Sequence, residues 1–174
     1  SVFDSIPKLL ERTGTNDRGT ITAFYAVLVD GDDMNEPIAD TVRGVLDGHV
    51  VLSRKLAMEY HYPAIDVLQS ISRLSKRVTG KMTQKAVGKV RELMAVYQNN
   101  AQMINAGIYT KGSSVQIDEA IDKHDEIEAF LKQEEDERCP MADTLDKLKA
   151  LTGIDIPEEE YEERPAIKKN AAVS

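Results

Sequence analysis

The sequence predicts an α/β fold, in which a layer of alternating strands and helices is followed by a purely helical module. Two observations indicate this. Over the first 54 residues, runs rich in β-branched and aromatic residues alternate with segments whose apolar residues recur at helical spacing. That alternation is typical of a parallel sheet covered by helices. After residue 75 the apolar residues follow the helical period alone, over stretches too long for strands.

Two short helices are expected in the first part. Apolar residues at helical spacing predict a helix over residues 2–12, in which Pro7 is the discordant residue. A second helix is expected over residues 37–46, because Pro37 occupies a position that the first helical turn accepts.

Two buried strands are expected beside these helices. Residues 20–29 follow a polar, glycine-bounded loop and are apolar on both faces, which is typical of a strand buried in a sheet. Residues 50–52 are too few for a helix and sufficient for a second buried strand. The alternation of these four elements predicts the parallel sheet.

The second part predicts two long amphipathic helices, over residues 82–104 and 115–131. Either Ser113 or Ser114 can cap the second one. A short glycine-containing connection, residues 107–112, predicts an antiparallel pair. A third helix is expected over residues 141–151 and ends before a glycine. The acidic segment beyond it has the composition of an exposed tail.

Composition excludes several classes of protein. The net charge of −8 argues against non-specific binding of nucleic acid, although residues 43–91 carry 10 basic and only 3 acidic groups. The longest apolar run, residues 23–29, is far shorter than a membrane-spanning helix. A single cysteine leaves no internal disulfide, so a reducing cytosol is the expected compartment. Three histidines without neighbouring cysteines do not make a zinc cluster.

The known motifs for binding phosphate or activating a serine are absent from the sequence. A self-contained active site is therefore not expected. Residues 61–73 are the strongest candidate for a ligand site, because they lie between the α/β layer and the helical module. Ligand sites form preferentially at such junctions.

Three strings in the chain carry a resemblance to a known family: ITAFYAVLVDGDDMNEPIAD (21–40), LDGHVVLSRKLA (46–57) and HYPAIDVLQSISR (61–73). They closely resemble the flagellum-specific ATPase of the type III export apparatus. They are more distantly similar to the catalytic subunit of rotary ATP synthases and to the injectisome ATPases. The resemblance covers about residues 1–132.

The resemblance implies the C-terminal part of a RecA-like nucleotide-binding domain over residues 1–75 and a helical C-terminal domain over residues 76–132. An acidic helical extension and tail, residues 133–174, follow. It further implies that the phosphate-binding loop, the Mg²⁺-binding strand and the catalytic glutamate lie upstream. Because the chain begins with Ser1 rather than Met, we expect it to be a piece of a longer protein that does not hydrolyse ATP alone.

Particular residues take roles through the resemblance. Arg73 matches the arginine finger, which reaches the γ-phosphate held by the neighbouring subunit; the alternative is an arginine paired with a local carboxylate such as Asp66. A permanently charged, planar guanidinium suits the charge that spreads over the phosphoryl oxygens. Tyr62 matches the aromatic that stacks on adenine, and Pro63 stiffens its turn. The alternative for Tyr62 is a core tyrosine.

Two further sites are implied. The loop Asp32-Asp33-Met34-Asn35-Glu36 matches the segment that touches the central stalk in rotary relatives, and the alternative is a solvated loop. Where rotary relatives have a second aromatic near adenine, this chain has Ile108 and Tyr109. We expect Ile108 to be the contact, although either could approach the base.

The implied function is ATP hydrolysis, with ATP and Mg²⁺, coupled to the unloading and unfolding of flagellar export substrates. The implied assembly is a homohexamer in the cytoplasm, peripheral to the membrane at the export gate. Its partners would be a stalk-like coiled-coil protein, a regulator subunit, export chaperones and substrates. One alternative is an injectisome ATPase. Another is a non-catalytic module whose helices bind chaperones or the stalk.

Overall fold

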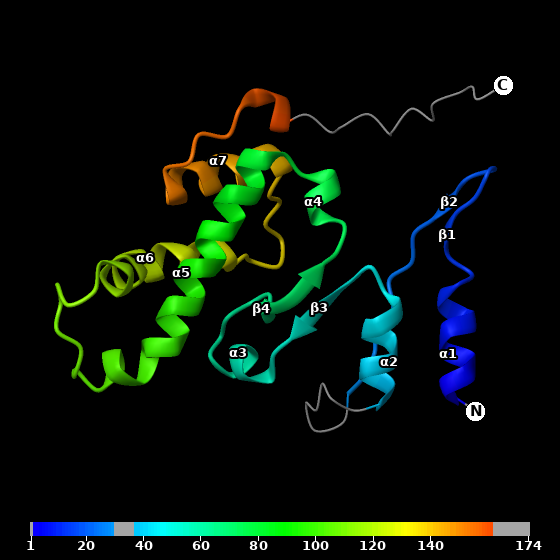
Figure 1. Cartoon of the computed structure of the whole chain (residues 1–174), viewed down its shortest axis with the longest axis horizontal. Coiled ribbons are helices and arrows are strands. Elements are labelled where there is room, and N and C mark those ends of the chain that lie inside the picture. The colour runs from blue at the N-terminus through cyan, green and yellow to red at the C-terminus, as the bar shows by residue number, and fades with distance from the viewer. Residues whose placement is uncertain (1, 30–36, 162–174) are drawn as a thin grey trace.

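The computed structural model of the chain describes residues 2–29 and 37–161 (Figure 1). Its elements in chain order are α1 (Val2–Leu10), β1 (Gly14–Thr15), β2 (Thr20–Ile21), α2 (Pro37–Val45), β3 (Gly48–Leu52), α3 (Arg54–Met58), β4 (Ile65–Ser72), α4 (Ser75–Val78), α5 (Lys81–Asn105), α6 (Val115–Leu131), α7 (Met141–Thr152) and a 3-10 turn (Glu158–Glu160).

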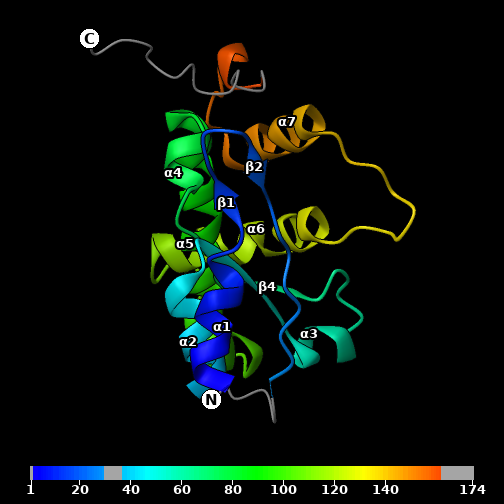
Figure 2. The ribbon, with the colours of Figure 1, turned by 90° about the vertical axis from the view of Figure 1, so that its right-hand side faces the viewer.

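The two short helices predicted in the first part are confirmed as α1 and α2, and they lie side by side in both views (Figures 1 and 2). Leu10 of α1 and Ala39 and Val42 of α2 are buried. The turn between β1 and β2 is closed by Asn16, whose side chain accepts hydrogen bonds from the amides of Arg18 and Gly19.

The buried strand predicted over residues 20–29 is wrong for this structure. Only Thr20 and Ile21 form a strand, paired antiparallel with β1. Phe24 and Leu28 are 97% and 96% exposed. A strand that is apolar on both faces needs sheet neighbours and covering layers. Among the residues that the structure describes, none pairs with residues 22–29.

The expected parallel sheet is also wrong. β3 confirms the strand expected over residues 50–52, but it pairs antiparallel with β4, which the sequence did not predict. The connection between them contains only the five residues of α3 and a turn, so the chain returns directly alongside β3. His49 pairs with Ile71 and Val51 pairs with Asp66. Val50 alone therefore lies opposite residues 67–70. These four residues interrupt the regular pairing and form the bulge of β4.

The helical module holds the largest buried cluster. The three predicted helices are confirmed as α5, α6 and α7, and α6 returns across α5 (Figure 1). Their shared core is Ala86, Val90, Leu93, Ala120, Ile127, Leu145, Leu148, Leu151 and Ile156. Ser114 rather than Ser113 caps α6, because its side chain accepts from the amide of Ile117. Gly153 ends α7 at a φ of 67°, in the left-handed region that glycine tolerates best.

Candidate nucleotide-site residues

Tyr62 and Pro63 lie in the turn between α3 and β4, which is held against the far end of α6. The His61 imidazole Nδ1 lies 3.0 Å from the Glu128 carboxylate, and His61 is buried. The amide of Gln133, just after α6, donates to the Tyr62 carbonyl at 2.9 Å. The Tyr62 ring is 52% exposed and Pro63 is exposed. The structure therefore anchors the turn and leaves the ring accessible, which does not suit a core tyrosine.

Arg73 follows β4 directly and is exposed. Its amide donates to the Asp47 carbonyl at 2.8 Å, and its Nη2 donates to the Arg43 carbonyl at 3.2 Å. The Asp66 carboxylate instead accepts from the amide and the side chain of Gln69. The alternative of a local ion pair between Arg73 and Asp66 is thus not the arrangement found.

The two sites lie at opposite ends of one strand. The ends of β4 pair with Gly48 and Leu52 of β3. Four steps along β3 span about 13 Å, and Tyr62 and Arg73 lie beyond the two ends. One end of the strand is thus followed by a guanidinium and the other is preceded by an exposed aromatic residue.

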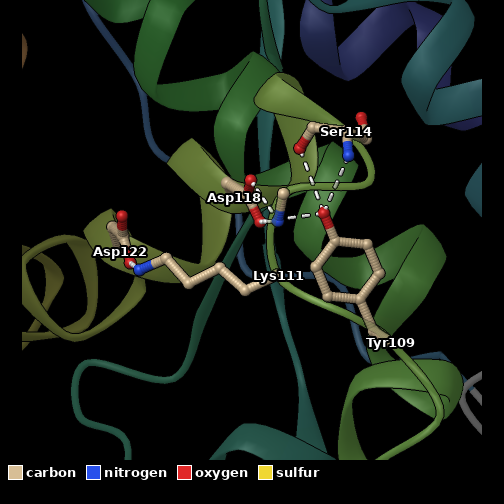
Figure 3. A network of polar contacts seen from close by, with 6 residues as sticks. Tyr109, Lys111, Ser114, Asp118 and Asp122 are labelled. Atoms are coloured by element: carbon tan, nitrogen blue, oxygen red, sulfur yellow. Dashed lines mark hydrogen bonds and ion pairs between the residues drawn. The ribbon is translucent and has the colours of Figure 1, made fainter.

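Tyr109 takes part in a polar network at the start of α6 (Figure 3). Its hydroxyl donates to the Asp118 carboxylate at 2.9 Å and is within 3.1 Å of both the amide and the carbonyl of Ser114. Partial burial and the hydrogen bond to Asp118 raise the pKa of Tyr109 above its ordinary value. The ion pair with Asp122 at 2.7 Å raises the pKa of Lys111. The loop is therefore fixed to the first turns of α6.

The structure attaches the loop that carries Ile108 and the turn that carries Tyr62 to different parts of α6, and the contact of Ile108 with adenine stays a prediction. The loop carrying Ile108 is bonded to Asp118, whereas the Tyr62 turn is bonded through His61 to Glu128. Between these two attachment points α6 rises about 15 Å, more than the width of a purine. Ile108 is 71% exposed and lies in the loop before α6.

The expected stalk-contacting loop, Asp32-Asp33-Met34-Asn35-Glu36, lies outside the described residues. In the part of the chain that is described, no group of three or more His, Cys, Asp or Glu side chains could hold a metal ion. Within the same ranges, every helix is too short or too polar to span a bilayer.

Three residues at this junction were missed by the sequence analysis. Arg91 of α5 donates hydrogen bonds to carbonyls in the bulge of β4. His61 and Glu128 join the Tyr62 turn to α6 across 67 positions of sequence. Contacts between residues so far apart in the sequence leave no periodic signal. Only the position of His61, directly before Tyr62, could have suggested that His61 has a role in the site.

Comparison with known proteins places these features in a family. The nucleotide-binding domain of the ATP synthase alpha/beta family matches residues 1–72, and the T3SS EscN ATPase C-terminal domain matches residues 79–150. The second match extends past residue 132, where the sequence resemblance was expected to stop. Together the matches define a nucleotide-binding domain followed by a helical C-terminal domain, as the fold-class prediction had it.

The chain is 55% identical over 153 residues to the flagellum-specific ATP synthase of Bacillus subtilis (strain 168), a match that covers 88% of this chain and 35% of the relative. It is similar to the assembled ATPase EscN of the enteropathogenic E. coli type III secretion system, at 40% identity and a TM-score of 0.84, covering 87% of this chain and 37% of that one. EscN in complex with its central stalk EscO matches with 39% identity and a TM-score of 0.78, over 87% and 36% of the two chains.

Residues 1–72 therefore belong to the ATP synthase alpha/beta family, and residues 79–150 belong to the family of the T3SS EscN ATPase C-terminal domain. The chain spans about a third of the length of the relatives it matches.

Proposed function

We propose that this chain is part of an ATPase that couples ATP hydrolysis to flagellar type III protein export. The single observation that carries the proposal is the placement of Tyr62 and Arg73, both exposed, at opposite ends of β4. An adenine stacker and an arginine finger for two different nucleotides require this separation. In a ring, Tyr62 would serve the subunit's own ATP and Arg73 would serve the ATP of its neighbour.

The proposed roles follow from the chemistry of each side chain. An exposed aromatic ring on an anchored turn offers a flat face to a purine, with little rotamer freedom to lose on binding. A planar guanidinium such as that of Arg73 presents its N–H donors in a fork that matches the geometry of a phosphate. The bond from Arg73 to the Arg43 carbonyl is an exchangeable contact that a γ-phosphate can replace. The phosphates and Mg²⁺ would be held mainly by parts of the longer protein outside this chain.

The proposed assembly is a homohexameric ring around a coiled-coil stalk. EscN, with which this chain shares fold and 40% identity, is described as an assembled ATPase, and a second structure contains its central stalk EscO. We further propose that the ring works at the cytoplasmic face of the membrane. There it would contact a regulator subunit, export chaperones, their substrates and the export gate. We favour the flagellar branch over the injectisome because identity to the flagellar relative, 55%, exceeds the 49% to the SPI-2 type 3 secretion system ATPase of Salmonella typhimurium.

The test is ATP turnover of the full-length hexameric protein carrying Arg73→Ala, at concentrations that span ring assembly. Loss of the finger should lower kcat about 10³-fold or more without preventing assembly. Arg77→Ala is the matched control, because Arg77 is also exposed and lies in the neighbouring helix α4. Unchanged turnover, with impaired binding of cargo or stalk, would instead favour the non-catalytic interaction module.

A further inference from the structure

The bulge of β4 lies against α5 and is bound there by one side chain. Arg91 Nη1 donates to the carbonyl of Val67 at 2.5 Å, with a longer contact of 3.5 Å to that of Ser70. Its Nη2 donates to the carbonyl of Leu68 at 3.0 Å. All three acceptors belong to residues 67–70, the segment that makes β4 irregular. A single guanidinium of the helical module therefore binds the strand that leads to Arg73.

Contacts within β4 and β3 orient the bulge toward Arg91. The Ser70 hydroxyl donates to the Asp66 carbonyl at 2.6 Å and accepts from the Val51 amide at 3.0 Å. It thus replaces the backbone partner that Val51 loses to the bulge. The Asp66 carboxylate holds the amide and side chain of Gln69. The bulge is consequently a fixed loop whose free carbonyls are available to a cation.

We propose that Arg91 is a positioning residue for Arg73: by binding the β4 bulge, it sets where the finger strand ends relative to the helical module. This inference rests on the proposed function of Arg73. A planar guanidinium with five N–H donors in a fixed fork can bind several carbonyls at once, which the point charge of a lysine cannot reproduce. Ser70, at the end of the bulge, is three residues before Arg73.

The same helical module also fixes the other end of β4. α5, which carries Arg91, packs on α6, and Glu128 of α6 holds His61 beside Tyr62. The helical module thus contacts the segments at both ends of the strand.

The experiment compares Arg91→Ala, Arg91→Lys and Arg91→Gln in the full-length hexamer, each alone and combined with Arg73→Ala. Arg91→Ala should lower kcat about 10-fold to 100-fold with little change in the KM for ATP, because a misplacement of about 1 Å near the reacting groups has that effect. Arg91→Lys should recover part of the loss. Lys85→Ala is the control, because Lys85 is exposed on the same helix.

Combination with Arg73→Ala separates positioning from general stability. If Arg91 acts through Arg73, substitution of Arg91 should leave the rate of ATP hydrolysis nearly unchanged in the Arg73→Ala background. Single-turnover kinetics measures this rate. The inference would be overturned if Arg91→Ala lowered kcat by the same factor with and without Arg73, or if it raised the KM for ATP and left kcat unchanged. It would also be overturned if Arg91→Ala kept the kcat of the unmodified protein while Arg73→Ala was inactive. If Arg73→Ala itself retains turnover, the proposed function fails, which is a separate result. Should Arg91→Ala not assemble, the Lys and Gln variants complete the same comparison.

Discussion

The carboxylate of Glu160 occupies the space that a side chain on Gly80 would need. A Cβ built on Gly80 would lie 1.9 Å from Glu160 Cδ. From this position Glu160 accepts hydrogen bonds from the amides of Met82 and Thr83, at 3.0 and 2.8 Å, and from the Thr83 hydroxyl at 2.7 Å. The cap residue of α5, Gly80, has no side chain to do this. A residue near the end of the described chain therefore caps the longest helix.

Gly80→Ala is predicted to destabilise the protein only while Glu160 is present. The displaced carboxylate would lose its bonds to the helix, at a cost of about 1 kcal/mol or more. In a Glu160→Ala background the same change should be neutral or slightly stabilising, because Gly80 has a φ of −72° that any residue adopts. Denaturant midpoints for the four variants measure this coupling. An equal cost in both backgrounds would contradict the capping role.

Ser70→Ala is predicted to destabilise the β3–β4 pair. The Val51 amide, on a buried residue, would lose its acceptor, the Ser70 hydroxyl. Leaving such a donor unsatisfied costs about 1–3 kcal/mol. Ser72→Ala, at the exposed end of the same strand, is the control and should change stability by less than about 0.5 kcal/mol. Equal denaturant midpoints for the two variants would show that the bulge does not need Ser70.

Tyr62→Ala in the full-length protein is predicted to raise the KM for ATP about tenfold or more, with kcat nearly unchanged. The reason is that stacking on a base is worth about 1–3 kcal/mol and acts equally in the ground and transition states. Tyr62→Phe keeps the ring and should behave like the unmodified protein. A normal KM for Tyr62→Ala, measured by steady-state kinetics, would remove the adenine-stacking role.

Sequence periodicity located the helices because each buries one face against a neighbour within this chain. The predicted bounds of the second long helix, residues 115–131, coincide with α6. The strand prediction for residues 20–29 failed for the opposite reason. Its pattern of apolar residues on both faces describes an environment of neighbouring strands and covering layers, and Phe24 and Leu28 have no such environment among the described residues.

The sequence predicted which residues belong to the candidate site, but it did not predict where they lie relative to one another. Tyr62 and Arg73 were identified because they lie in one continuous motif, HYPAIDVLQSISR. β4 within that motif was missed, since the bulge over residues 67–70 breaks the alternation that marks a strand. The sequence did not show that the Ile108 loop and the Tyr62 turn are attached to different parts of α6. Such placements depend on tertiary contacts like that between His61 and Glu128.

Leu148→Ala is predicted to unfold the helical module at markedly lower denaturant concentration. Leu148 of α7 is 4% exposed and packs in the same cluster as Val90 and Ile127. Truncating a buried leucine costs about 2–5 kcal/mol. Met141→Ala is the control on the same helix, because Met141 is 69% exposed. Equal midpoints for the two variants would mean that the segment after residue 132 contributes nothing to the core.

The network around Tyr109 predicts a defined pH dependence. Partial burial and donation to Asp118 raise the pKa of Tyr109 above its ordinary value of about 10. The folded state therefore holds this proton more tightly than the unfolded state does. The stabilisation is fully present below about pH 10, and it is lost as the pH rises through the higher pKa of the folded state.

Titration of ¹³C-labelled tyrosine by NMR measures this effect directly. The Tyr109 signal, assigned by its absence in Tyr109→Phe, should titrate above the ordinary tyrosine pKa of about 10. Asp118→Asn removes the carboxylate acceptor and should lower the pKa of Tyr109. The stability difference between the unmodified protein and Tyr109→Phe should accordingly stay constant up to about pH 10 and shrink above it. A Tyr109 signal that titrates at the ordinary tyrosine pKa of about 10 would show that the loop is not held to α6 in solution.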